Sequence, residues 1–191
     1  MSARGTILAA VRANKLQGEH PLPALPSFPP DDCGDRVALF LKNLEAMGGR
    51  GKEGGAIDDL LRERFHDAKV IASAVPEFEG NRDLRHVTEP SDLADVDVAT
   101  VRASFGVAET GSVLLADDAL IANAVAYLAQ HLVVLVAPVD ILATIQDAYY
   151  RPEFQRHAYA SFHTGPSATA DIEGVLIHGA QGVRSLTVLI I

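Results

Sequence analysis

The sequence contains no tryptophan, and aromatic residues make up only 6% of it. Proteins that bind single-stranded nucleic acid stack the bases on aromatic side chains, so this composition argues against such a surface. The formal net charge is -9, and phosphate backbones are bound by basic surfaces. We therefore expect no nucleic-acid partner.

Cysteine is nearly absent, since Cys33 is the one cysteine among 191 residues. A single thiol forms no disulfide framework, and an iron–sulfur cluster normally takes several cysteine ligands. This cysteine usage is typical of a reduced, cytoplasmic protein. The GxGxxG fingerprint of dinucleotide-binding proteins and the GxSxG elbow of serine hydrolases are also missing. We predict no metal ion and no bound cofactor.

Long hydrophobic runs are missing as well. The most apolar stretch, "LVVLVAPV" at 132–139, is far shorter than the roughly 20 residues of a membrane helix. The N-terminal "MSARGTILAAVRANK" has no long apolar core before a cleavage site. With 48% hydrophobic and 21% charged residues, the chain has an ordinary globular composition. We expect a soluble protein without a membrane span.

Proline, by contrast, is concentrated near the N-terminus. Half of the chain's ten prolines lie in 18–34, namely Pro21, Pro23, Pro26, Pro29 and Pro30. Proline removes backbone donors and restricts the preceding residue, so this segment is predicted to be an extended strap. An apolar stripe, Ile7, Leu8 and Val11, predicts a helix before it. We divide the chain into a helix and strap, 1–31, and a main domain, 32–191. The helix either packs on another subunit or folds back locally.

The rest of the chain alternates between helical and strand patterns. Helices are predicted after Asp35, from Ile57, over 120–128 and from Pro138, whereas 69–75, 131–138 and 185–191 are apolar runs typical of buried strands. "GGRGKEGG" at 48–55 lacks the residue order of a P-loop, which favours a mobile connector over a phosphate cradle. "FGVAETGSVLLAD" predicts a hairpin that turns at Thr110–Gly111. This alternation indicates an α/β sheet covered by helices.

Glu109 lies in the turn of that hairpin and is the first candidate for chemistry. Next to apolar strands, burial would raise the pKa of its carboxyl toward neutrality and suit it to act as a nucleophile or general base. The alternative is a carboxylate that only accepts backbone amides in the turn. The spacing leaves both interpretations open.

The second candidate is "HTGPSATADIEGVLIHG" at 163–179. Gly165 and Pro166 indicate a turn, and the segment then offers the hydroxyls of Ser167 and Thr169 and the carboxylates of Asp171 and Glu173. These groups could cap a helix, or they could surround an anionic ligand. His163 and His178 flank the segment, but no metal-binding spacing such as HExxH supports a metal site.

Together, the two segments resemble the LUD-domain family, specifically its lactate-utilisation protein C (LutC-like) branch. The matching residues are the AETG turn, 108–111, the TGPS-x-TADIE segment, 164–173, and the HG-x-x-G-x-R run that ends at Arg184. The N-terminal helix and proline-rich strap also resemble the family. The resemblance covers nearly the whole chain, and its TGPS-x-TADIE run is the specific motif.

This resemblance implies a three-layer α/β/α fold like that of the ribose-5-phosphate isomerase, glucosamine-6-phosphate deaminase and CoA-transferase group (NagB/RpiA/CoA transferase-like). It also implies a non-redox role in oxidising L-lactate to pyruvate beside iron–sulfur partner proteins. Two other functions stay open: a stand-alone isomerase or acyl transferase acting on a small phosphorylated or carboxylate ligand, and a structural adaptor whose first helix docks on a partner.

With the resemblance taken into account, a ligand-facing bend at 165–173 is favoured over a helix cap. We predict that the AETG turn and this bend surround one cleft at the rim of the sheet. The catalytic candidates are Glu109 and Asp171, and the predicted ligand-binding residues are Thr110, Gly111, Ser112, Gly165, Pro166, Ser167, Thr169 and Glu173.

Overall fold

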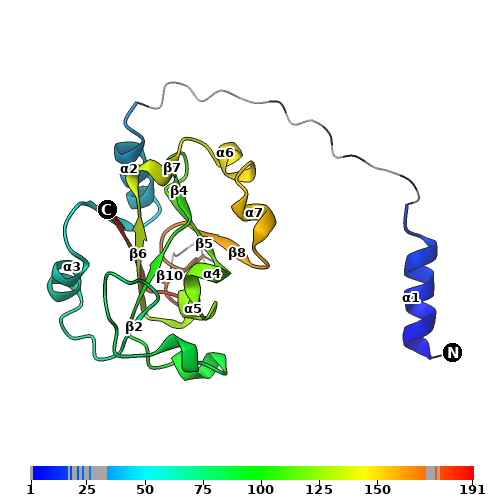
Figure 1. The fold of residues 1–191 in the computed structure, drawn as a ribbon, viewed down its shortest axis with the longest axis horizontal. Helices are drawn as coiled ribbons and strands as arrows, with labels where there is room; N and C mark the ends of the chain where they lie inside the picture. The colour runs from blue at the N-terminus through cyan, green and yellow to red at the C-terminus, as the bar shows by residue number, and fades with distance from the viewer. Residues whose placement is uncertain are drawn as a thin grey trace.

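The computed structural model of the chain describes residues 2–16, 18, 21, 23, 26, 34–170, 175 and 177–191. Its centre is a five-stranded sheet with the order β1-β11-β6-β3-β2, in which each pair of neighbours is parallel (Figure 1). The strands are β1 (Arg50–Glu53), β2 (Ile71–Ser73), β3 (Val98–Arg102), β6 (His131–Val136) and β11 (Ser185–Ile190). The apolar runs of the last two form its buried middle, as the sequence predicts.

Side chains that alternate along these strands build a separate core on each face of the sheet. Helix α3 (Ile57–Arg64) covers one face and packs against Val133 and Leu135. Helices α2 (Arg36–Ala46), α4 (Asp117–Leu120) and α5 (Val125–Leu128) share a core with Leu132 and Val134 on the other face. The predicted α/β architecture, a parallel sheet flanked by helices, is confirmed.

A second sheet, with the order β7-β4-β5-β8, lies on the α2 side. It contains the predicted hairpin, β4 (Phe105–Val107) and β5 (Ser112–Ala116), with β7 (Ile141–Leu142) and β8 (Ala160–His163) at its edges. Its outer face packs against α6 (Ile145–Tyr149) through Ala148. The remaining elements are η1 (Leu84–His86), η2 (Pro90–Leu93), η3 (Pro138–Asp140), α7 (Glu153–Arg156) and a small pair, β9 (Ala168–Thr169) with β10 (Ile177–His178).

The glycine-rich stretch 48–55 is a strand and not the mobile connector that its composition favours. It forms β1, the exposed edge strand that pairs with β11. Its glycines allow α2 to lie directly against it, because a Cβ at Gly49 would come within 2.3 Å of Leu44 Cδ1 and one at Gly51 within 2.1 Å of Leu41 Cδ2. Backbone pairing and helix packing, which local composition does not report, decide the structure here.

Two predicted helices are also wrong in detail. The helix predicted over 120–128 is two short helices, α4 and α5, interrupted where Ile121 adopts a φ of 61° and Ala122 N donates to Leu120 O. The helix predicted from Pro138 is the single turn η3, after which Ile141 and Leu142 pair with β4. Helix α6 starts only after Thr144, which forms a capping box with Asp147.

At the N-terminus, α1 (Ala3–Ala13) is capped by Ser2 and has no buried residue. Most of 17–33, including Cys33, lies outside the described residues, so the strap stays a prediction. Among the helices that the structure describes, none combines the length and the apolar character needed to cross a bilayer.

Candidate functional site

The AETG turn is held by helix α2 and by the start of helix α6. Asn43 Nδ2 donates to the carbonyl oxygens of Ala108 and Glu109, at 2.8 and 3.0 Å. The exposed Glu109 accepts the amide of Ile145 at 2.8 Å through Oε2. A carboxylate at the first residue of a helix satisfies a backbone donor and favours the positive end of the helix dipole. The carboxylate of Glu109 therefore has a structural partner, the backbone amide of Ile145.

Gly111 explains why this turn needs glycine. Its φ is +66°, and a Cβ there would lie 2.2 Å from the backbone nitrogen of Leu44. Gly165, in the second motif, has the same constraint on the same helix, since its φ is +77° and a Cβ would lie 2.2 Å from Met47 O. Both glycine turns therefore pack against the C-terminal half of α2.

Hydroxyl groups join the two motifs. Ser112 Oγ donates to Thr110 Oγ1 at 2.7 Å, and it lies 2.6 Å from Thr164 Oγ1 in a second hydrogen bond. Ser112 is buried, and the two threonines are half-buried. The structure thus brings the two predicted segments together. They meet through hydrogen bonds and through α2.

The bend after Gly165 forms the β9–β10 pair rather than the start of a helix. Ser167 exchanges backbone hydrogen bonds with Val183 O and Gly179 N, at 3.0 and 2.8 Å, and Thr169 pairs with Ile177. Gly182 packs on the Ser167 side chain, where a Cβ would come within 2.9 Å. Ser167 does not cap a helix, because the residues that follow it, Ala168 and Thr169, form strand β9. Asp171 and Glu173 lie outside the described residues.

A cavity of about 530 Å³ opens beside this bend, at the amino ends of β1, β6 and β11. Parallel strands place their amino ends at one edge of the sheet, so residues far apart in sequence meet there. It is lined by Gly48, Arg50, Glu63, Arg64, Phe65, His131, Pro166, His178, Arg184, Ser185 and Leu186. We call it the arginine cleft. Pro166 belongs to it, whereas Glu109, Thr110, Gly111 and Ser112 do not.

The charge of the arginine cleft is positive, although the whole protein carries -9. Within the described part of the chain, Arg50, Arg64 and Arg184 form no ion pair with a carboxylate. The lining acid, Glu63, lies 4.0 Å from Lys52. Arginine stays protonated in proteins, so three positive charges face this space.

Arg64 is the half-buried member of this group. Its Nη1 donates to Thr187 Oγ1 at 3.3 Å, which anchors the side chain to β11. Burial, followed by the nearby charge of Arg50, lowers the pKa of the guanidinium. Two cations held close together repel each other, and a bound anion would relieve that repulsion.

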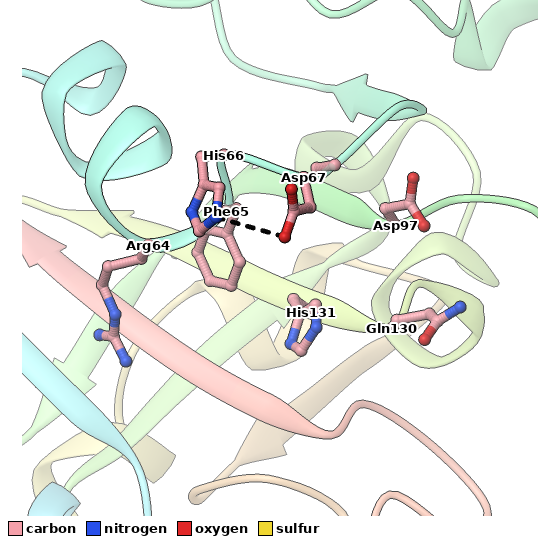
Figure 2. Close-up of a pocket in the computed structure, with 8 residues that line it drawn as sticks. Arg64, Phe65, His66, Asp67, Asp97, Gln130 and His131 are labelled. Carbon is pink, nitrogen blue, oxygen red and sulfur yellow. Dashed lines mark ion pairs between the residues drawn. The ribbon is translucent and has the colours of Figure 1, made fainter.

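His131 lines both this cavity and a second one. Its Nδ1 lies 2.8 Å from Ser185 Oγ, and its ring centroid lies 5.0 Å from that of Phe65. Burial and then the Arg184 charge lower the pKa of the imidazole, so it is neutral at pH 7. The second cavity, of about 250 Å³, shares Arg64, Phe65 and His131 and continues to Asp67, Asp97 and Gln130 (Figure 2).

The flanking histidines have different environments. His178 lines the arginine cleft. His163 Nε2 lies 3.0 Å from Ser161 Oγ, in a network with the hydroxyls of Tyr127 and Tyr159, and burial lowers its pKa to about 4. The structure therefore does not bring the two histidines together as ligands of one metal.

Among the described residues, Asp117, Asp118 and His157 place possible metal-ligand atoms within 4.8 Å of one another. His157 Nδ1 already lies 2.8 Å from Asp117 Oδ1, in a hydrogen-bonded pair that accounts for this arrangement without an ion. The cluster belongs to α4 and the segment before β8, apart from the residues that line the arginine cleft.

Sequence reasoning missed the arginines because they occur in three unrelated local patterns. Arg50 stands in the glycine-rich stretch, Arg64 ends an amphipathic helix, and Arg184 closes the HG-x-x-G-x-R run. Arg184 and Pro166 were the available signals, since both belong to motifs. The glycine-rich stretch, for which a phosphate cradle is the alternative interpretation, contributes Arg50 to the cleft, while its Lys52 faces Glu63.

Comparisons with known proteins agree with this description. The family model described as LUD domain matches residues 52–191. The fold is similar to the crystal structure of a DUF162 family protein from Deinococcus radiodurans, with a TM-score of 0.66 and 14% sequence identity. That match covers 84% of this chain and 99% of the other. No curated protein matches the chain significantly.

Proposed function

Because the chain belongs to the LUD-domain family, through a match over 52–191, we propose that it acts as a lactate-utilisation protein C-like subunit. In this role it supports the oxidation of L-lactate to pyruvate beside iron–sulfur partner proteins, and its arginine cleft holds a small carboxylate or phosphorylated anion. The observation that carries the ligand part is the set of three arginines around one cavity, none of which forms an ion pair with a carboxylate of the described residues.

Arginine is well suited to this task. Its planar guanidinium donates two parallel hydrogen bonds to a carboxylate or phosphate, and it keeps its charge at any physiological pH. Arg64 is anchored through Thr187, and Arg184 follows the buried Val183 directly, so part of the donor set is positioned before the ligand arrives. On an acidic protein, a local positive potential also selects where an anion binds.

The cysteine content separates the proposed role of this chain from that of its iron–sulfur partners. With one cysteine, the chain holds no iron–sulfur cluster of the usual cysteine-ligated kind, so electrons from lactate would pass through clusters in the partners. Residues 1–31 then serve as an arm, separate from the domain at 32–191. Helix α1 supports this division because its apolar Ile7 and Val11 are each 63% exposed.

The ligand part is tested by calorimetric titration of the full chain with L-lactate, pyruvate and inorganic phosphate. Arg64→Ala and Arg184→Ala should each weaken binding of the anion about tenfold or more, because each removes a charged donor. Arg62→Ala is the matched control, since Arg62 lies on the same helix but exposes 75% of its side chain. If all three variants bind the anion equally well, the arginine cleft is not the anion site.

The complex is tested by co-purification with cysteine-rich partner proteins and by lactate-dependent dye reduction. Adding this chain to the partners should raise dye reduction, and the Arg184→Ala variant should raise it less. If the partners reduce the dye equally well without the chain, a supporting role in lactate oxidation is wrong.

Thr169→Ala tests the bend separately. We propose that the hydroxyls of Ser167 and Thr169 contribute hydrogen-bond donors to the same anion site. Pro166 connects the bend to the cleft. Unchanged ligand affinity in Thr169→Ala would limit the site to the arginines.

A further inference from the structure

The arginine cleft and the second cavity are neighbours, and the chemistry of their lining residues differs. The two cavities share Arg64, Phe65 and His131. Beyond them, the larger one holds Arg50 and Arg184. Figure 2 shows Arg64 on one side of the Phe65–His131 pair and Asp97 and Gln130 on the other. A ligand that occupied both cavities would have an anionic end, a planar part at the Phe65–His131 pair, and hydrogen-bond donors near Asp97 and Gln130.

We propose that this cleft binds a nucleotide-like organic phosphate. Its phosphate lies at Arg50, Arg64 and Arg184, and its heterocyclic ring lies against Phe65 and His131, near Asp97 and Gln130. This inference rests on the anion site proposed above and names the class of its ligand.

Volume is the first argument for a ligand of this size. The arginine cleft measures about 530 Å³, in the range of about 300 to 1,000 Å³ that is usual for pockets of drug-sized ligands, and the second cavity adds about 250 Å³. A three-carbon acid would leave most of this space to water. A phosphate joined to a ring through a sugar spans both parts.

The ring pair at the junction is the second argument. The rings of Phe65 and His131 are 5.0 Å apart between centroids and tilted by 38°, and the Arg64 guanidinium lies 5.9 Å from the Phe65 centroid. Aromatic side chains and arginine planes are the surfaces on which nucleic bases stack. A neutral His131 stacks without repelling the donor groups of a base.

The far end is the third argument, because it accepts hydrogen bonds. Asp97 Oδ2 receives the amides of Lys69 and Val70 at 2.7 and 2.9 Å, which fixes the carboxylate and lowers its pKa. Its Oδ1 accepts no hydrogen bond from the described residues. An ionised carboxylate beside a side-chain amide, that of Gln130, suits the exocyclic amino group and ring nitrogens of a base.

Calorimetric titrations with four probes test the proposal on the full chain: adenosine 5′-monophosphate, ribose 5-phosphate, inorganic phosphate and L-lactate. We expect adenosine 5′-monophosphate to bind at least tenfold more tightly than ribose 5-phosphate, which differs from it by the ring alone. Phe65→Leu should abolish this tenfold difference. Phe78→Leu, a change in the same core cluster away from both cavities, should preserve it. Urea unfolding of both variants checks that they are folded.

The outcomes separate this inference from the proposed function. If phosphate or lactate binds with dependence on Arg184 but the ring adds no affinity, the nucleotide proposal is wrong and the anion site stands. If the ring adds affinity that Phe65→Leu leaves intact, the base lies elsewhere and the proposal is also wrong. If none of the four probes binds, the anion site itself is refuted.

Discussion

Replacing Gly111 by alanine is expected to destabilise the protein through a direct collision with helix α2. The added Cβ would lie 2.2 Å from Leu44 N and 2.6 Å from both Asn43 C and Leu44 Cα, all of them backbone atoms. No side-chain rotation relieves such contacts, so the turn or the helix must move. Because Asn43 also holds the carbonyls of the turn, the movement would strain those hydrogen bonds as well.

The magnitude has two parts. A left-handed backbone costs an alanine about 1–2 kcal/mol relative to glycine, and overpacking an ordered interior costs about 1–3 kcal/mol more. The free energy of unfolding should therefore fall by about 2–5 kcal/mol, out of the 5–15 kcal/mol of stability typical of a domain.

Gly54→Ala is the matched control for the second part. Gly54 has a φ of +70°, close to the +66° of Gly111, but nothing lies within 4 Å of its Cβ position. The loss of unfolded-state entropy is common to both changes and cancels in the comparison. Gly54→Ala should thus cost only about 1–2 kcal/mol, the backbone part.

Urea unfolding followed by far-ultraviolet circular dichroism measures both variants. A lower midpoint with an unchanged slope reports a change in stability alone. If Gly111→Ala loses no more free energy than Gly54→Ala, α2 does not press on the AETG turn. The turn would then be open to a ligand, and the conclusion that α2 packs directly against it would be refuted.

Three further predictions address other parts of the molecule. Glu109→Gln should keep near-normal stability and lactate-dependent dye reduction, since an amide oxygen also accepts the Ile145 amide, whereas Glu109→Ala should lose about 1 kcal/mol of unfolding free energy. Loss of turnover in the glutamine variant alone would instead favour the stand-alone enzyme with Glu109 as nucleophile or base. Between pH 6.5 and 4 the unfolded chain protonates His163 more readily than the folded one, whose pKa is about 4. Stability should therefore fall as the pH drops through this range, by about 2 kcal/mol at pH 5, and His163→Gln should flatten this part of the profile in urea unfolding; an unaltered slope would place the dependence on other groups. Deleting residues 1–31 should leave the melting temperature nearly unchanged, because α1 buries no residue, while abolishing co-purification with the iron–sulfur partners. Retained co-purification would exclude α1 as the contact.

The sequence by itself determined the elements whose signal is local. The apolar runs at 131–136 and 185–190 are strands because nearly every side chain along them is buried between two helical layers. The turn at Thr110–Gly111 was also predictable, since a positive φ selects glycine. Gly165 and Pro166 also predict a turn from the local sequence, whereas Arg184 is singled out only by the resemblance to the LUD-domain family.

Only the tertiary structure decided the edge strand, the interrupted helix and the cleft. β1 has exposed residues throughout and is a strand only because β11 offers it backbone partners. Ile121 carries an apolar side chain at helical spacing, yet its backbone turns there so that α4 and α5 can both pack on the sheet. Arg50 lies in β1, Arg64 in α3, and Arg184 directly before β11. Electrostatic attraction for an anion depends on the distance between charges, and parallel strand order, rather than chain position, sets that distance here.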